Sequence, residues 1–233
     1  TPKLIFGSHL VENFKNLNKK MDILRILMNS AIMTVTYTAL SIILHSMAGY
    51  ALAKFEFKGK GLLFSLIMVT MMIPSQVMYV PLFTLMNNIG WANTYQAVVL
   101  PGLAGAFGIF LMRQNMLAFP TSLIEAARID GASELYSFHR IALPIMSPGI
   151  ATMAIMAFIG NWNNYLLPMI ILNKNEKFTL PVMMATLKAS TDIQRNQGAI
   201  YLAVAISVIP ILIVFCFCSK YIISSISAGS VKE

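Results

Sequence analysis

Five long stretches of the sequence contain no Asp, Glu, Lys or Arg; they cover 26–53, 62–86, 97–112, 147–172 and 199–219. About 20 apolar residues are enough for a helix to cross a bilayer. A charged side chain in mid-bilayer costs roughly 2.5–3.5 kcal/mol on insertion scales. The pattern therefore predicts an all-α fold, a polytopic transmembrane helical bundle with five spans.

Charge content and charge placement agree with a membrane environment. Only 11% of the residues are charged, whereas a soluble domain carries roughly a quarter. The 17 Lys and Arg residues, which give a net charge of +8, lie mostly at the ends of the apolar stretches, where they meet lipid headgroups and water. We therefore expect membrane lipid as a partner and no nucleic acid. Cys216 and Cys218 lie two positions apart in an apolar stretch and indicate neither a disulfide framework nor a metal site.

Helix breakers recur inside the stretches, and a lone histidine lies in the first. Such breaks persist in a bilayer only where neighbouring helices or water satisfy the freed backbone, so these spans should line protein or a cavity. His45 has no acidic companion within a span, which favours a histidine paired inside the bundle over a proton-handling role. The breakers are Pro74, Pro81, Pro101, Gly102, Gly105, Gly108, Pro168 and Pro210.

Short loops set the predicted orientation. Lys54, Lys58 and Lys60 follow the first stretch, whereas 87–96 contains no Lys or Arg, so the positive-inside rule places the first loop in the cytoplasm. The domain plan is then an extracytoplasmic arm at 1–25, a transmembrane domain at 26–224 with a cytoplasmic loop at 113–146, and a cytoplasmic tail at 225–233. Because five spans then start outside, we expect a sixth span before Thr1.

Residues 120–144, called the polar loop below, form a polar segment in an otherwise apolar chain, and their pattern predicts a defined local structure. Ser122 and Glu125 have the spacing of a capping box, which predicts a helix over 123–130. Gly131 then stands where a left-handed residue would end that helix. Two turns are too short to be stable alone in water, so neighbours or a partner must hold them. A second short helix is predicted over 133–140.

Besides a docking element for a soluble partner, the polar loop has two other interpretations. An amphipathic helix lying on the bilayer fits the spacing equally well. A DNA-reading helix-turn-helix also has two short helices, but the two flanking spans disfavour it.

The polar loop resembles the EAA loop that marks permease subunits of binding-protein-dependent ABC importers. The motif reads Glu125-Ala126-Ala127, three residues, Gly131, nine residues, Ile141, one residue and Leu143-Pro144. The rest of the chain is similar to the carbohydrate, maltose-permease-like branch. Those matches are Leu10-Val-Glu12-Asn13-Phe14, Asn29-Ser30, 48–55, 71–74, Thr94-Tyr95, 110–113, Trp162-Asn163, 179–181 and 228–232.

The resemblance implies a function without bond chemistry. It implies a type I ABC importer permease in a prokaryotic cell membrane, with no catalytic residue, no metal and no cofactor of its own. ATP and Mg would be bound by two cytoplasmic ATPase subunits, and the other partners would be a second permease and an extracytoplasmic solute-binding protein. The chain has no Gly-x-x-x-x-Gly-Lys-Ser/Thr run, so it is not itself the ATPase. The implied ATPase-coupling residues are Glu125, Ala126, Ala127, Arg128, Asp130, Gly131, Ile141, Leu143 and Pro144.

A polar-aromatic cluster in the fourth stretch is the candidate for the translocation pathway. It comprises Asn161, Trp162, Asn163, Asn164 and Tyr165, a composition suited to sugar hydroxyls and to an apolar sugar face. Hydrogen bonding between helices at a permease–permease contact explains the cluster equally well. Relatives often carry an acid where Asn164 stands, so no charge-based role is expected there.

Two further polar residues lie beside the Pro74 break. Thr70 and Gln76 are weaker pathway candidates than the cluster in the fourth stretch.

Two rival functions come from other classes. An ion-coupled secondary transporter of a small polar solute would normally place acids near the midplane, and the five stretches contain none. A membrane enzyme would need a cluster of nucleophile, base or metal ligands, and the three histidines show no ligand spacing.

Overall fold

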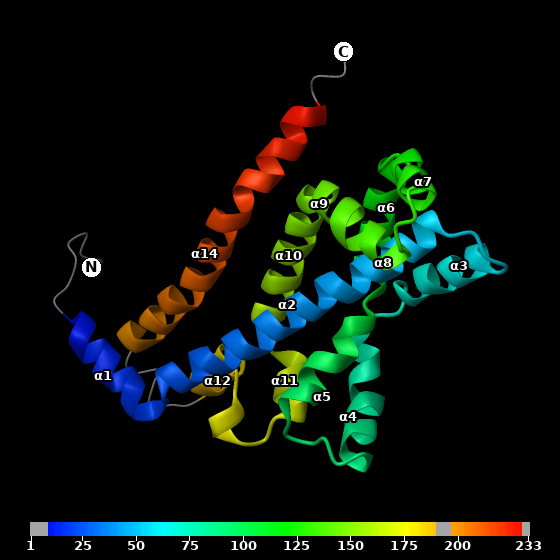
Figure 1. The fold of residues 1–233 in the computed structure, drawn as a ribbon. Helices are drawn as coiled ribbons and strands as arrows, with labels where there is room; N and C mark the ends of the chain where they lie inside the picture. The colour runs from blue at the N-terminus through cyan, green and yellow to red at the C-terminus, as the bar shows by residue number, and fades with distance from the viewer. Residues whose placement is uncertain (1–8, 190–196, 230–233) are drawn as a thin grey trace.

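The computed structural model describes residues 9–189 and 197–229, and in that part of the chain every regular element is helical (Figure 1). Two helices are each long and apolar enough to cross a membrane, α2 (Ile23–Lys54) and α14 (Gln197–Gly229). Three further spans are possible if each of three bent helix pairs is counted once. The all-α bundle is therefore confirmed. Residues 1–8 of the predicted arm and 230–233 of the predicted tail lie outside the described residues.

Helix α2 runs along the whole molecule and joins its three apolar clusters. It contains no proline, and its first turn is capped by Asp22, whose carboxylate accepts the backbone N–H of Arg25 at 3.1 Å. Ile26 belongs to a cluster with α1 (Leu10–Lys20), α10 (Ser147–Trp162), α12 (Leu180–Ala189) and α14. Met33 and Tyr50 belong to the other two clusters. Figure 1 shows α2 reaching from α1 to the region of α7 and α8.

The second stretch is two helices and not one. α3 (Lys60–Thr70) lies at 90° to the pair formed by a 3-10 turn (Ser75–Met78) and α4 (Tyr79–Asn88). Pro74 stands at the corner, because proline has no N–H to continue the helix. Pro81 was expected to break a helix as well, and this was wrong. It lies in the first turn of α4, where a missing N–H costs nothing.

The third stretch bends at a glycine. α5 (Tyr95–Val99) and the 3-10 turn Leu100–Ala104 meet α6 (Ala106–Ala118) at 45°, with Gly105 between them. Gly108 in α6 lets the ring of His45 pack against the backbone, because a Cβ there would overlap the imidazole. His45 Nε2 lies 2.9 Å from the carbonyl oxygen of Leu103. The interpretation of a histidine paired inside the bundle is therefore confirmed.

The fourth stretch also consists of two helices. α10 ends at Trp162, and α11 (Leu166–Ile171) begins after three intervening residues. Pro168 lies in the first turn of α11 and is not the break, and Pro210 lies inside α14 without ending it. The polar cluster 161–165, called the break at 161–165 below, comprises the last two residues of α10 and the three residues between the two helices.

Short elements complete the chain. In the polar loop these are α7 (Ser122–Ile129), α8 (Glu134–Ser137), a π-helical segment (Phe138–Ala142) and α9 (Leu143–Ile145). The helical run 134–145 meets α10 at 81°. On the opposite side of the molecule, a 3-10 turn (Asn175–Lys177) precedes α12. Asn29 and Ser30 of α2 hold that region, since Asn29 Nδ2 donates to the carbonyl of Phe178 and Ser30 Oγ accepts the N–H of Leu180.

Candidate functional site

The polar loop begins with a helix whose predicted capping box does not form. α7 starts at Ser122, so Ser122 already lies inside the helix, and the N–H of Glu125 donates to the carbonyl of Thr121 at 3.1 Å. Thr121 has helical dihedral angles and makes no side-chain cap. Its hydroxyl instead accepts a hydrogen bond from Lys54 Nζ at 3.2 Å. A distant lysine has therefore fixed the helix entry one residue earlier than the local pattern predicts.

The end of α7 agrees with the sequence. Gly131 has a φ of 81°, the left-handed conformation that glycine adopts without a steric cost. The N–H of Ala132 donates to the carbonyl of Ala127 at 2.9 Å, and the N–H of Gly131 donates to that of Arg128 at 3.0 Å. These two bonds form a Schellman motif, so Gly131 sets the direction in which the chain leaves α7.

The second helix of the polar loop has a cap that the sequence analysis missed. Ser133 Oγ accepts the N–H of Tyr136 at 3.2 Å, which is the pattern of an N-cap. The serine before the acidic Glu134 was the available signal. The helical run then passes through the π-helical segment and continues to Ile145, beyond the predicted end at residue 140.

The predicted coupling residues divide between two faces of α7. Ile124 and Ala127 face the protein interior, with 0% and 8% of their surface exposed. Ala127, one of the implied coupling residues, therefore does not lie on the open face of α7. Ser122, Glu125 and Ala126 are exposed, as are Arg128, Asp130 and Gly131. Ile141 and Leu143 pack partly buried against the cluster around Ile124, while Pro144 is exposed.

The open face carries an apolar residue that sequence reasoning did not single out. Ile129 is 86% exposed and lies one turn after Glu125. An isoleucine four positions after an acid on a polar face was the signal that could have revealed it. Glu125, Ala126 and Ile129 therefore form one exposed patch, the α7 patch.

An ion pair closes the carboxyl end of α7. Arg128 Nε donates to the Glu134 carboxylate, and the Arg128 guanidinium lies 5.6 Å from the centre of the Phe55 ring. This hydrogen bond holds the pKa of the Glu134 carboxyl below its ordinary value. The other carboxylate oxygen of Glu134 accepts the hydroxyl of Tyr50 at 3.3 Å.

The last two residues of α10 make side-chain hydrogen bonds to other helices. Trp162 is 3% exposed, and its Nε1 donates to the carbonyl of Ser207 in α14 at 3.0 Å. Its ring stacks on Phe158 with centroids 5.7 Å apart. Asn161 Oδ1 accepts the hydroxyl of Thr34 at 3.2 Å. These contacts join α10 to α14 and α2.

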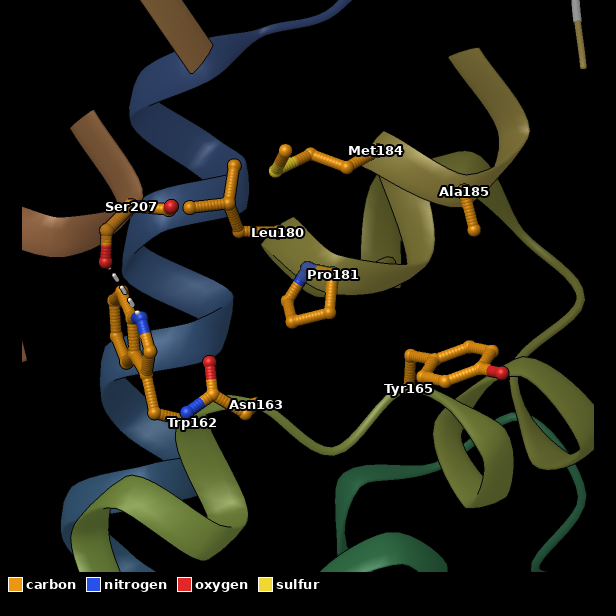
Figure 2. A pocket seen from close by; sticks show the side chains of 8 residues that line it. All are labelled: Trp162, Asn163, Tyr165, Leu180, Pro181, Met184, Ala185 and Ser207. Atoms are coloured by element: carbon orange, nitrogen blue, oxygen red, sulfur yellow. Dashed lines mark hydrogen bonds between the residues drawn. The ribbon is translucent and has the colours of Figure 1, made fainter. Parts of the chain in front are cut away.

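The neighbouring residues open into a cavity. Asn163 and Tyr165 are exposed and line a hollow of about 510 Å³ (Figure 2). One side chain bond ties Asn163 to its own helix, since its Nδ2 donates to the carbonyl of Ile159 at 3.0 Å. The opposite wall comes from α12 and α14 and consists of Leu180, Pro181, Met184, Ala185 and Ser207. Figure 2 shows the Tyr165 ring and Pro181 across from the edge of Trp162.

Asn164 faces another part of the molecule. It lines a second, mainly apolar cavity of about 460 Å³ together with Ser75, Tyr79 and Gly102. Of the two remaining pathway candidates, Thr70 donates to the carbonyl of Ile67 at 2.7 Å, and Gln76 is exposed. Neither lines one of the two cavities described above. Five of the seven candidates are consecutive in the chain but do not share one cavity: Trp162, Asn163 and Tyr165 line the first, and Asn164 lines the second.

Comparison with known proteins identifies a family that covers most of the chain. Residues 45–227 match the family model described as "Binding-protein-dependent transport system inner membrane component". The arabinooligosaccharides transport system permease protein AraQ of Halalkalibacterium halodurans is 39% identical over 204 residues, which are 88% of this chain and 72% of that protein. The lactose transport system permease protein LacG of Rhizobium radiobacter is 33% identical over 99% of this chain and 83% of its own length.

A further relative and a solved structure also resemble this chain. The diacetylchitobiose uptake system permease protein NgcG of Streptomyces coelicolor is 33% identical over 95% of this chain and 74% of its own length. Among solved structures, a bacterial ABC transporter involved in the import of the acidic polysaccharide alginate has a chain that superposes with a TM-score of 0.72. That match covers 84% of this chain and 75% of the other, at 24% identity, and it shows a shared fold.

Proposed function

The chain belongs to the family of binding-protein-dependent transport system inner membrane components, and from this premise we propose that it forms half of the translocation pathway of an ATP-driven carbohydrate importer. It pairs with a second, similar permease, two cytoplasmic ATPase subunits and an extracytoplasmic solute-binding protein. The assembly lies in the plasma membrane of a prokaryote. ATP and Mg bind to the ATPase subunits, and this chain makes or breaks no covalent bond.

The α7 patch is the observation that carries the coupling role. α7 is an eight-residue helix, too short to persist alone in water, yet both of its ends are fixed by hydrogen bonds to the rest of the chain. Its outward side chains include an acid and a fully accessible isoleucine. We assign Ile129 as the apolar anchor in a cleft of the ATPase and Glu125 as the partner of a basic residue there. A desolvated ion pair of this kind costs roughly 2–5 kcal/mol to break.

The substrate class follows from the relatives and from the larger cavity. Three relatives carry names that refer to arabinooligosaccharides, lactose and diacetylchitobiose. In this chain Asn163 offers an amide to sugar hydroxyls, and the exposed Tyr165 ring offers an aromatic face to the C–H side of a sugar. No Asp or Glu lines this cavity among the described residues. That composition favours neutral carbohydrates.

The test is reconstitution in proteoliposomes with the cognate permease, ATPase and binding protein. Uptake is measured with radiolabelled arabinotriose, lactose, diacetylchitobiose, trehalose and sn-glycerol 3-phosphate, each with and without internal MgATP. We expect ATP-dependent uptake of at least one neutral sugar and strict dependence on the binding protein. Uptake driven by a proton or sodium gradient in vesicles that hold this chain alone would refute the proposal.

A further inference from the structure

The proposed function requires that movement of α7 reach the break at 161–165. α7 packs on the core formed by α6, α10 and the carboxyl end of α2, whereas the break lies beside the middle of α2 and beside α14. Some element must connect the two. α10 ends at the break and packs in the core under α7, and α2 makes side-chain hydrogen bonds to both regions.

The entry of α7 is tied to the last turn of α2 by a buried lysine. Lys54 is only 8% exposed, and its Nζ donates to the carbonyl of Phe119 at 2.6 Å and to the hydroxyl of Thr121 at 3.2 Å. The ammonium also lies 5.0 Å from the centre of the Phe119 ring. The two acceptors flank Pro120 immediately before α7. Hydrogen bonds from an ionised donor are about twice as strong as neutral ones, so this attachment is firm.

The exit of α7 is tied to the same helix one turn earlier. Tyr50 donates its hydroxyl to one oxygen of Glu134, and Arg128 in the last turn of α7 donates to the other. Tyr50 and Lys54 are four residues apart and therefore lie on one face of α2. The Tyr50 ring also packs against Phe138 with centroids 5.3 Å apart. α2 thus holds α7 at both ends with two side chains from adjacent turns.

α2 also contacts the break. The hydroxyl of Thr34 donates to Asn161 Oδ1, and Tyr37 donates to the carbonyl of Gly102 beside the second cavity. Between these contacts and Lys54 the helix is uninterrupted and contains no proline. Its 32 residues correspond to about 48 Å of helix. The second and third stretches are bent and the fourth is broken after Trp162, whereas α2 is continuous from Thr34 to Lys54.

We propose that Lys54 and Tyr50 are positioning residues that fasten α7 to α2, so that a displacement of α7 by the ATPase moves α2 and, through Thr34, the break at Asn161. This inference rests on the proposed function. The two residues contact neither the solute nor ATP, and neither belongs to the α7 patch. Substitution of these two residues should leave the ATPase bound, but nucleotide binding to the ATPase should no longer change the cavity.

The experiment uses the complete transporter with Cys216 and Cys218 replaced by serine and a reporter Asn163→Cys in the cavity wall. The rate at which N-ethylmaleimide labels the reporter is measured with and without MgATP plus orthovanadate. Lys54→Met removes both hydrogen bonds of the ammonium, and we expect the nucleotide-dependent change in labelling rate to fall at least about tenfold. In Tyr50→Phe we expect a smaller loss, because a neutral hydroxyl is removed and the ring stays.

Matched variants separate coupling from folding. Lys58→Met removes an exposed lysine four residues away, and Tyr201→Phe removes the hydroxyl of a tyrosine that is 69% exposed on α14. Both should respond to nucleotide as the parent does. Lys54→Arg should restore part of the response, because arginine keeps the charge and the donors. Co-purification of the ATPase and the melting temperature of the complex are measured for every variant.

The outcomes are distinct. A reduced response with a bound ATPase and an unchanged melting temperature supports the inference. An unchanged response in both Lys54→Met and Tyr50→Phe overturns it and leaves the proposed function intact. Loss of the ATPase or of thermal stability in step with the response also overturns it, since the residues would then only hold the fold. If the labelling rate of the parent protein does not change with nucleotide, the proposed role of this cavity in the translocation pathway is refuted.

Discussion

The two polar regions of the molecule, the α7 region and the break at 161–165, are built in opposite ways. In α7 the bonds that fix the helix come from its ends and from α2, which leaves Glu125, Ala126 and Ile129 pointing outward. At the break Asn161 and Trp162 make hydrogen bonds between helices, whereas Asn163 and Tyr165 are exposed in the first cavity. The proposed partner surface is thus presented by a local motif fixed at both ends, whereas the cavity wall consists of residues that do not join the helices.

The largest expected effect lies in the backbone of the polar loop. Gly131→Leu should abolish uptake while the protein still inserts, because a side chain in the left-handed conformation costs roughly 1–2 kcal/mol and the Schellman motif would open. Gly131→Asn is the matched control, since asparagine tolerates this conformation better. Uptake in proteoliposomes and membrane content by immunoblot are measured. Normal uptake in Gly131→Leu would show that the exit from α7 does not matter.

A somewhat smaller effect is expected on the α7 patch. Ile129→Asp should weaken ATPase binding by about 2 kcal/mol or more, as for an anchor residue at an interface, because a carboxylate would be desolvated where an apolar side chain fits. Ile129→Leu should bind nearly as well as the parent. Affinity for the purified ATPase by surface plasmon resonance measures the difference. Equal affinities of the Ile129→Asp and Ile129→Leu variants for the ATPase would show that Ile129 does not lie in the interface.

A substitution of the buried Trp162 should lower the stability of the protein and leave the ranking of transported sugars unchanged. Trp162→Phe keeps the stacking on Phe158 and loses the hydrogen bond to Ser207, so we expect a loss of about 1 kcal/mol in the free energy of unfolding. Thermal unfolding in detergent measures it. Phe158→Leu tests the stack separately. A changed ranking of sugars in Trp162→Phe without any loss of stability would mean that Trp162 contacts the solute.

The smallest expected effect belongs to the open side of the break. Asn163→Ala removes one amide from the cavity wall and should raise the KM for the transported sugar roughly two- to tenfold, the effect of one hydrogen bond of about 0.5–1.5 kcal/mol. ATP hydrolysis without solute should stay unchanged. Asn173→Ala serves as the control outside the cavity. An unchanged KM, or an equal change in both variants, would assign the solute to another surface.

Some features of the fold and the site could be predicted from neighbouring residues alone. The absence of charge over five stretches was enough to predict a helical membrane bundle, and Gly131 was enough to predict where α7 ends. Both depend on energies that act locally, namely the cost of charge in hydrocarbon and the freedom of glycine at positive φ. Pro74 likewise indicated a corner, because a missing N–H interrupts any helix.

Other features depended on residues far along the chain. The start of α7 was misplaced because Lys54 engages Thr121 and the carbonyl of Phe119, 65 residues away from it. Ala127 is buried because the residues that an eight-residue helix buries depend on what the helix packs on. The role of Trp162 could not be read from its neighbours, since its hydrogen-bond partner is Ser207.

The sequence by itself determined the membrane class, the family resemblance and the motif that ends in Gly131. Only the tertiary structure decided which residues of α7 face outward, which asparagines line a cavity and which helix joins the two regions. The physical reason is the range of the forces involved. Backbone preferences and hydrophobic burial act on a residue wherever it stands, whereas a hydrogen bond such as that of Lys54 or Trp162 exists only once distant segments are packed within about 3 Å of each other.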